Sequence, residues 1–221
     1  MHHPAEKRRI GAARARVIST SNSPVTAEPR VLRDRPVNPA LIFDCDGTLA
    51  DTMPAHYQAW QEVLEPMGMT FPLERFYAMG GMPTDKIVVF LANQAGKPVD
   101  VDAMVEAKSQ AFVRKMSEIR PIEKVVEIAR RGRGHQPMAV ASGGTRPMVE
   151  MTLAKIGVLD WFPVVVTAED TVRHKPEPDV FLEAARRLGV PAAECIVYED
   201  TDLGLEAARR AGMRGVDIRL L

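Results

Sequence analysis

Three short apolar segments of this chain end in polar side chains followed by glycine, and this pattern limits the folds open to it. The segments and the residues that follow them are 40–43 before Asp44, Asp46 and Gly47, 138–141 before Ser142 and Gly143, and 195–198 before Glu199, Asp200 and Gly204. Short apolar runs bounded in this way are typical of buried strands. In open α/β sheets, ligands bind at the carboxyl ends of the strands. The sequence therefore predicts a sheet with acidic and hydroxyl side chains along that edge.

The first segment ends in two aspartates, Asp44 and Asp46, separated by one residue. Side chains at such spacing point to the same face of an ideal strand, so the two carboxylates would repel each other. A bound cation or a transferable proton would relieve that repulsion. Taken alone, an Asp-x-Asp turn is more often a solvated loop, so the interpretation depends on the other segments.

The second segment ends in Ser142, Gly143 and Gly144, just before a helical pattern. Glycine-rich backbone at the start of a helix offers N–H groups to a phosphate. An ordinary strand-to-helix turn, with Ser142 or Thr145 as the N-cap, is an equally good interpretation of these residues alone.

Farther along, Lys175 is followed by Pro176, and Glu199 and Asp200 end the third apolar segment. Proline excludes a helix around the lysine, which favours a fixed positive charge over a freely moving one. Three carboxylates at one strand end, those of Glu199, Asp200 and Asp202, would be hard to keep together without a divalent cation, and for hard oxygen ligands that cation is normally Mg²⁺. A solvated lysine and a plain acidic turn remain the alternatives.

In chain order, these residues resemble the four signature motifs of the haloacid dehalogenase-like hydrolase superfamily, and the resemblance extends from residue 40 to residue 221. It implies an α/β fold, in which a doubly wound, parallel, Rossmann-like sheet carries an inserted helical cap. It also implies phosphoryl transfer through an aspartyl-phosphate. Asp44 would be the nucleophile, Asp46 the general acid and base, and Lys175 the cation that neutralises charge between nucleophile and phosphoryl group.

The same resemblance implies the ligands of the site. Asp44, the backbone carbonyl of Asp46 and Asp200 would hold Mg²⁺, with Glu199 assisting directly or through water. Ser142 and the amides of Gly143 and Gly144 would hold phosphate oxygens. An aspartate at position 46 also argues against a dehalogenase, because those enzymes carry tyrosine there and use no metal.

Apolar residues recur at helical spacing from residue 54 to about 119, interrupted near residues 66–68, 80–81 and 96–98. We expect this segment to be the cap. The predicted organisation is a disordered basic extension at 1–38, a catalytic core at 39–52 and 121–221, and a helical cap at 53–120. In the core, the sequence predicts helices at 123–131, 147–156, 179–188 and 204–211, and further strands from 138, at 164–166, from 195 and at 215–218.

Residues 51–60 narrow the resemblance to the branch that contains β-phosphoglucomutases and small sugar phosphatases. His56 and Trp60 share a helix face that could look into the cleft. Lys108 falls where this branch carries a cap lysine that reaches the substrate. The alternatives are a capping histidine, a core tryptophan and a solvated lysine.

One departure separates the two activities of that branch. The mutases carry an arginine that holds a second phosphate, and Thr84 stands at that position here. Residues 174–176 and 211–221 also look like the bacterial fructose-1-phosphate and 6-phosphogluconate phosphatases. The sequence therefore predicts a Mg²⁺-dependent phosphatase that hydrolyses a small sugar phosphate of one of these types. A β-phosphoglucomutase is the alternative, and a non-catalytic binding protein that uses the basic extension is a remote one.

Composition is consistent with one enzyme of 221 residues, 46% of them hydrophobic. No apolar run approaches the ~20 residues that cross a membrane. Residues 1–40 carry eight Lys or Arg against three acidic residues but no apolar signal segment, so no secretory signal is expected. That extension could touch nucleic acid or another polyanion, although a solvated extension is the preferred interpretation. We expect a cytoplasmic monomer whose partner is a small phosphorylated metabolite, with no membrane or nucleic-acid partner.

The two cysteines, Cys45 and Cys195, both lie in strand-end motifs, which places them at the active-site edge of the expected sheet. No disulfide is expected between them, consistent with a reducing compartment.

Overall fold

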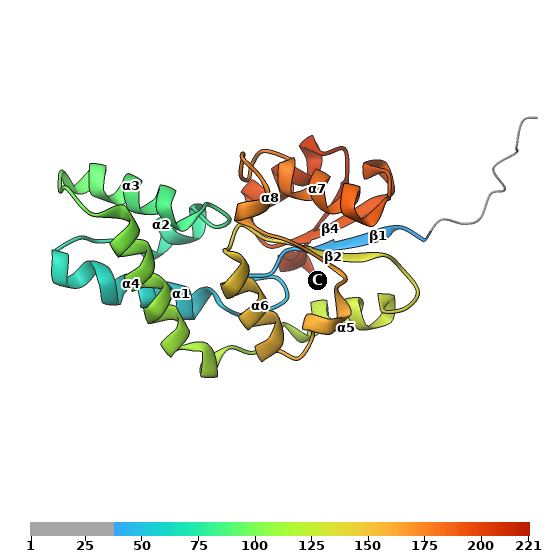
Figure 1. The fold of residues 1–221 in the computed structure, drawn as a ribbon, viewed down its shortest axis with the longest axis horizontal. Coiled ribbons are helices and arrows are strands. Elements are labelled where there is room, and N and C mark those ends of the chain that lie inside the picture. Colours follow the sequence, from blue (N-terminus) through green and yellow to red (C-terminus); the bar gives the residue numbers. More distant parts are fainter. Residues whose placement is uncertain (1–37) are drawn as a thin grey trace, which may run out of the picture. The chain divides into compact units, whose positions relative to one another are not determined.

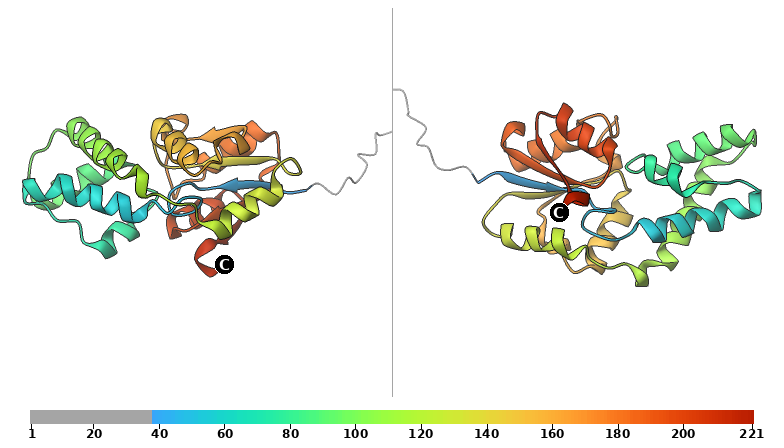
Figure 2. Two further views of the ribbon diagram at one scale, coloured as in Figure 1. Left: turned by 90° about the horizontal axis from the view of Figure 1, so that it is seen from below. Right: turned by 180° about the vertical axis from the view of Figure 1, so that it is seen from behind.

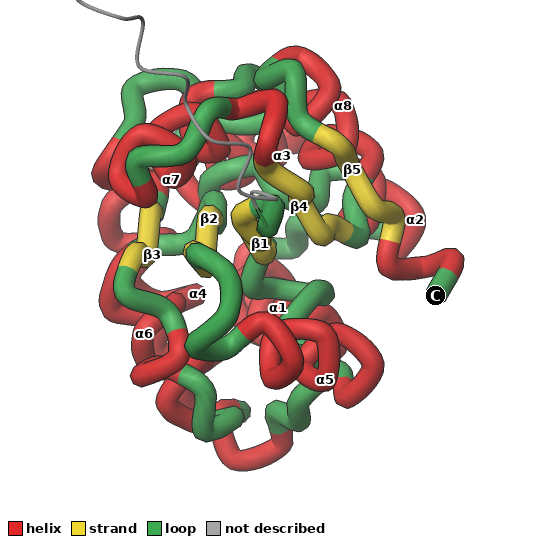
Figure 3. Tube along the Cα trace, turned by 90° about the vertical axis from the view of Figure 1, so that its right-hand side faces the viewer, coloured by secondary structure: helices red, strands yellow, loops and turns green. Residues whose placement is uncertain are grey.

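The computed structural model describes residues 38–221, and its centre is a five-stranded parallel sheet with the strand order β3-β2-β1-β4-β5. The strands are β1 (Ala40–Phe43), β2 (Met138–Ala141), β3 (Val164–Val166), β4 (Cys195–Glu199) and β5 (Arg214–Asp217). Figure 3 shows the five strands side by side. The predicted α/β fold with a parallel sheet is confirmed, and the predicted strands agree with these bounds to within a residue or two.

Helices cover both faces of the sheet (Figure 3). They are α5 (Glu123–Gly132) and α6 (Arg146–Lys155) on one face, and α7 (Asp179–Leu188) and α8 (Asp202–Arg210) on the other. The alternation of side chains along β1 explains this arrangement: Leu41 and Phe43 pack in the cluster with α5 and α6, whereas Ala40 and Ile42 pack in the cluster with α7 and α8. A strand that is buried on both faces carries apolar residues without interruption, as β1 does.

Between β1 and β2 lies a helical insertion, residues 53–118, beyond the carboxyl ends of the strands (Figures 1 and 2). Its α-helices are α1 (Met53–Leu64), α2 (Leu73–Ala78), α3 (Thr84–Ala95) and α4 (Val101–Arg114). They share an apolar cluster that includes Trp60, Leu64 and Phe71. The breaks expected from glycine occur, since Gly68 and Gly96 end helical segments in the left-handed conformation.

The order of the strands places a crevice at a defined point. From β1 the chain proceeds to β2 and β3 on one side, and then crosses back to β4 and β5 on the other. Ligands of doubly wound sheets bind where the direction reverses, which here lies between the carboxyl ends of β1 and β4. The backbone N–H of Asp44 donates to the carbonyl of Tyr198 at 3.0 Å, so the acidic ends of the two strands lie next to each other.

Both cysteines are buried free thiols. The expectation that both lie at the active-site edge was wrong for Cys195. This residue begins β4 and pairs with Ala40 at the start of β1, so it lies at the opposite end of the sheet from Asp44. The strand predicted from residue 195 is confirmed, but Cys195 lies at its amino end.

None of the helices within residues 38–221 is long and apolar enough to span a membrane. The predictions for the basic extension concern residues outside the described part of the chain. The division into a core and a cap at the boundaries given above stays a prediction.

Candidate active site

A buried lysine connects the ends of β1 and β4. Lys175 Nζ lies 2.7 Å from Asp44 Oδ1 and 2.7 Å from Glu199 Oε2, and its side chain is 1% exposed. Burial lowers the pKa of Lys175, but the two carboxylates outweigh burial and raise it overall. The lysine is therefore a permanent positive charge at the base of the site, as the prolines after it suggested.

Both oxygens of the Glu199 carboxylate accept hydrogen bonds. One oxygen accepts from Lys175, and the other accepts from the hydroxyl of Thr201 at 2.7 Å and from its backbone N–H at 3.0 Å. Glu199 is 0% exposed. This carboxylate consequently holds Lys175 in place.

Asp44, Glu199 and Asp200 form an acidic group whose nearest oxygens all lie within 4.8 Å of one another. Burial and the charge of Glu199 raise the pKa of Asp200 to about 7. Burial and the charges of Glu199 and Asp200 raise the pKa of Asp44, against the opposing effect of Lys175. The raised pKa values of Asp44 and Asp200 indicate that the positive charge of Lys175 alone does not neutralise the three carboxylates.

A glycine allows Asp200 to approach the end of β1. Gly47 has a φ of +84°, and a Cβ at this position would lie 2.3 Å from Asp200 Oδ2. The hydroxyl of Thr48 donates to Asp200 Oδ1 at 2.8 Å and fixes its orientation. The site therefore combines hard oxygen donors with an excess of negative charge, and Asp200 lies close to the end of β1. These features fit a small divalent cation. Gly47 and Thr48 were not selected from the sequence as site residues, since Asp200 lies 153 and 152 positions away from them.

The Ser142 loop follows β2 beside this acidic group. Ser142 is 1% exposed, its backbone N–H donates to the carbonyl of Val166 at 3.0 Å, and its Oγ accepts from the N–H of Gly144 at 3.1 Å. The N-cap residue of α6 is Thr145, whose side chain makes no capping hydrogen bond. The Ser142 hydroxyl is thus not the cap of α6, and it lines the cleft together with Gly143.

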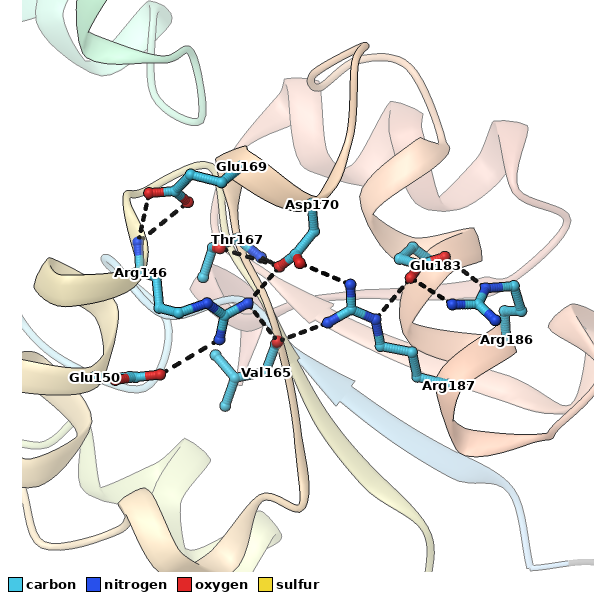
Figure 4. Close-up of polar contacts among 9 residues, drawn as sticks. All are labelled: Arg146, Glu150, Val165, Thr167, Glu169, Asp170, Glu183, Arg186 and Arg187. Carbon is cyan, nitrogen blue, oxygen red and sulfur yellow. Dashed lines mark hydrogen bonds and ion pairs between the residues drawn. The ribbon is translucent and has the colours of Figure 1, made fainter.

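A network of ion pairs supports the Ser142 loop from outside (Figure 4). Asp170 accepts from Arg146 at 2.6 Å and from Arg187 at 2.7 Å, while Glu169 accepts the backbone N–H of Arg146 at 3.0 Å. The N–H of Ala168 donates to the carbonyl of Gly144 at 3.0 Å. The turn at residues 168–170 therefore fixes the end of the loop that leads into α6, while Val166 of β3 holds Ser142 at the other end. Nothing in the sequence singled out this turn, although Thr167 and Asp170 have the spacing of a capping box.

Two residues of the helical insertion are linked to Asp46. His56 Nε2 lies 3.3 Å from Asp46 Oδ1, and Lys108 Nζ lies 2.8 Å from His56 Nδ1. Burial and the charge of Lys108 lower the pKa of His56, and burial lowers the pKa of Lys108 to about 8. A lysine ammonium that donates to Nδ1 leaves the proton of a neutral imidazole on Nε2, directed at Asp46. Although burial opposes it, the interaction with His56 and, after it, the charge of Lys108 lower the pKa of Asp46 overall.

A cleft between the sheet edge and the helical insertion encloses about 100 Å³. From the sheet side it is lined by Asp44, Asp46, Ser142, Gly143, Gly144, Glu199 and Thr201. From the insertion it is lined by Met53, His56, Trp60, Phe76, Met79, Gly80, Gly81, Met82, Thr84, Ile87 and Lys108. Trp60 packs in the apolar cluster of the insertion and also borders the cleft, so both interpretations of this residue hold.

The structure thus brings every sequence-predicted site residue to one place. Lys175 lies below the cleft, Asp200 belongs to the acidic group, and the others line the cleft wall. Their catalytic and binding roles stay predictions.

Comparison with known proteins gives one consistent result. The haloacid dehalogenase-like hydrolase family matches residues 41–218. Fructose-1-phosphate phosphatase YqaB of Escherichia coli is 40% identical over 183 residues, which cover 82% of this chain and 96% of that protein. The β-phosphoglucomutase of Bacillus subtilis is 25% identical over 189 residues, covering 81% of this chain and 82% of that enzyme. The crystal structure of a hydrolase from Pseudomonas syringae superposes with a TM-score of 0.73 at 27% identity, covering 81% of this chain and 84% of that one.

Proposed function

Because the chain belongs to the haloacid dehalogenase-like hydrolase family, we propose that it hydrolyses a small sugar phosphate of the fructose 1-phosphate or 6-phosphogluconate type through an aspartyl-phosphate. The observation that carries this proposal is the contact of Lys175 with Asp44 at 2.7 Å, at the closed end of a cleft lined by Ser142. A carboxylate in this position can act as a nucleophile toward a phosphoryl group held by the loop.

In the first step, a carboxylate oxygen of Asp44 attacks phosphorus and the bond from phosphorus to the sugar oxygen breaks. The Ser142 hydroxyl and the Gly143 amide hold the phosphoryl oxygens, and Lys175 keeps the attacking carboxylate oriented. Positioning and charge neutralisation supply most of the acceleration in reactions of this kind. Glu199 contributes by fixing Lys175 between itself and Asp44.

Asp46 transfers the proton in both steps. In its protonated form it gives the proton to the leaving sugar oxygen, and as a carboxylate it then removes a proton from the water that attacks the phosphoaspartate, which releases phosphate and restores both Asp44 and the protonated Asp46. The hydrogen bond from His56 fixes the orientation of Asp46, and Lys108 fixes that of His56. Since both come from the helical insertion, we infer that the insertion is a cap whose closure completes the site.

We further propose Mg²⁺ as the cofactor, which Asp44, the backbone carbonyl of Asp46 and Asp200 would hold. When bound, Mg²⁺ would supply positive charge to the phosphoryl oxygens and to the acidic group. The raised pKa values of Asp44 and Asp200 and the close seat at Gly47 support this assignment.

A β-phosphoglucomutase is the second candidate, favoured by the link from Lys108 through His56 to Asp46 and by the similarity to a protein of that name. Isomerisation requires a grip on a second phosphate. The residues of the insertion that line the cleft include Thr84 but no arginine. The phosphatase therefore fits this cleft better.

The test is phosphate release from a panel of sugar phosphates, with and without Mg²⁺, by the wild type, Asp44→Asn and Asp160→Asn. Asp160 is an exposed aspartate paired with Arg133, so its variant is a matched control. We expect Asp44→Asn to lose about 10⁴-fold or more in kcat, as in other enzymes that lose their nucleophile. Full activity of Asp44→Asn would refute the nucleophile. Conversion of β-glucose 1-phosphate to glucose 6-phosphate without phosphate release would identify a mutase.

A further inference from the structure

The turn between α2 and α3 of the helical insertion contacts the catalytic residues through glycines. A Cβ at Gly80 would lie 2.9 Å from Cγ2 of Thr201, closer than side chains approach in proteins. A Cβ at Gly143 would lie 2.7 Å from the carbonyl oxygen of Gly81, so the Ser142 loop and the turn also meet without side chains between them. At this point the two parts of the structure touch almost backbone to backbone.

Thr201 cannot easily yield at this contact. It is 9% exposed, its hydroxyl donates to Glu199 at 2.7 Å, and the same oxygen accepts the N–H of Gly204 at 3.0 Å. These two bonds fix the rotamer, and therefore the direction of the methyl group that faces Gly80. A moved Thr201 would disturb Glu199 and, through it, Lys175.

Gly80 has no need of glycine for its own backbone. It lies outside the positive-φ residues of the described chain, whereas Gly81 has a φ of +84° and would be strained by any side chain. A Cβ at Gly80 would meet the methyl group of Thr201 at 2.9 Å and, less closely, the carbonyl oxygen of Tyr77 at 3.1 Å. The contact with Tyr77 is the same whichever side chain stands at residue 201, so a change at residue 201 separates the two. This makes Gly80 the position where the contact can be tested separately from backbone strain.

We propose that Gly80 is a specificity-determining residue, whose missing side chain lets the turn seat on Thr201 and sets how far the insertion closes over the reacting group. The inference rests on the proposed function, because closure brings His56 and Lys108 to Asp46. A methyl group at residue 80 holds the turn away from the sheet edge. Substrates that depend on a proton from Asp46 lose most, and aryl phosphates, whose leaving phenolate needs no proton, lose least.

The test is a double-mutant cycle of Gly80→Ala and Thr201→Ser. Serine keeps the hydroxyl that bonds Glu199 and removes only the methyl group that faces Gly80. In the wild-type background, we expect Gly80→Ala to lower kcat/KM for the best sugar phosphate by about 10- to 100-fold, because it displaces groups that position the substrate. Against Thr201→Ser, the same change is expected to cost no more than about 3-fold, and p-nitrophenyl phosphate hydrolysis should change little in either background. Equal losses in both backgrounds, or no loss in the first, would overturn the proposal.

A second readout needs no substrate. Amide hydrogen exchange at residues 79–82 and 142–144 should be faster in Gly80→Ala than in the wild type, and should slow again in the double variant. Unchanged exchange would show that Gly80 does not pack against Thr201. If the wild type releases no phosphate from any sugar phosphate, the proposed function fails, and the exchange experiment still decides whether Gly80 seats on Thr201.

Discussion

Two clusters of ion pairs in this molecule each join one charged group to two groups of the opposite charge, but they lie in different surroundings. In the active site, Lys175 lies between Asp44 and Glu199, and these side chains are 7% exposed or less. On the outer side of the Ser142 loop, Asp170 lies between Arg146 and Arg187, whose side chains are 38% and 31% exposed (Figure 4). The N–O distances are nearly the same, 2.7 Å in the first cluster and 2.6–2.7 Å in the second.

Contact distance therefore does not distinguish the two clusters, but access to water does. A buried charge that loses its partner has no solvent to replace it, whereas an exposed one is resolvated and screened by salt. In the active site, the consequence is that Lys175 keeps the orientation of the Asp44 carboxylate, which we propose as the nucleophile. In the surface network, the consequence is a support that tolerates change.

Removing the shared cation of the buried cluster should have the largest effect on folding. Lys175→Met leaves Asp44 and Glu199 without their partner, and we expect the free energy of unfolding to fall by about 3–5 kcal/mol. Urea denaturation measures this, with Lys155→Met, at an exposed lysine of α6, as the matched control. The double variant Lys175→Met/Glu199→Gln should recover part of the loss. A Lys175→Met protein as stable as the control would mean that burial does not govern the cluster.

Lys108 sharpens the comparison, because it is buried beside an imidazole and is not held by a carboxylate. Burial lowers its pKa to about 8, below the value of about 10.4 expected in the unfolded chain. Between these values the unfolded state binds the extra proton, so the folded protein gains stability as pH rises from 8 to 10, by up to about 1.4 kcal/mol per pH unit. Below pH 8 this slope vanishes. The difference in unfolding free energy between the wild type and Lys108→Met, measured from pH 7 to 10, isolates this contribution, and a difference that does not vary with pH would contradict it.

The buried cluster was largely predictable from the sequence, and the surface network was not. Asp44, Ser142 and Asp200 each follow an apolar strand, and parallel strands bring their carboxyl ends to one edge, so local patterns located a site built by distant segments. The family and the class of enzyme, a phosphoric monoester hydrolase, are confirmed by the family match and by the similarity to a phosphatase.

The contacts that complete the site depend on three-dimensional proximity with no local pattern. Because Gly47 has no side chain, Asp200 can approach it, and the same holds for Gly80 and Thr201. Glycines in loops have many other uses, so the sequence did not reveal these contacts. The family resemblance placed Lys108 and His56 at the cleft separately, and their pairing was not predicted, because 52 residues separate the two. Cys195 shows the converse error, in which a correctly predicted strand did not reveal at which of its ends the residue lay.

Asp170→Asn breaks the surface network at its centre. Asp170 bonds two arginines and the backbone N–H of Thr167, so we expect a loss of about 1 kcal/mol in unfolding free energy at low salt, at the upper end for exposed pairs. The loss should shrink in 1 M NaCl because salt screens charges that water reaches. Asp160→Asn, which removes a carboxylate with one arginine partner, is the control and should cost less. A loss that salt leaves unchanged would place Asp170 with the buried cluster.

Glu206→Gln is expected to have the smallest effect of all. Glu206 accepts hydrogen bonds from Arg209 and Arg210 on α8, and these bonds lower its pKa to about 2. A carboxyl with a lowered pKa stabilises the folded state above its usual pKa, and that contribution disappears as pH falls through the lowered value. All three side chains are in contact with solvent, so we expect urea denaturation at pH 7 and 0.15 M salt to give the same midpoint for Glu206→Gln and the wild type. A destabilisation as large as that of Asp170→Asn would show that the number of arginine partners, and not exposure, sets the strength of these clusters.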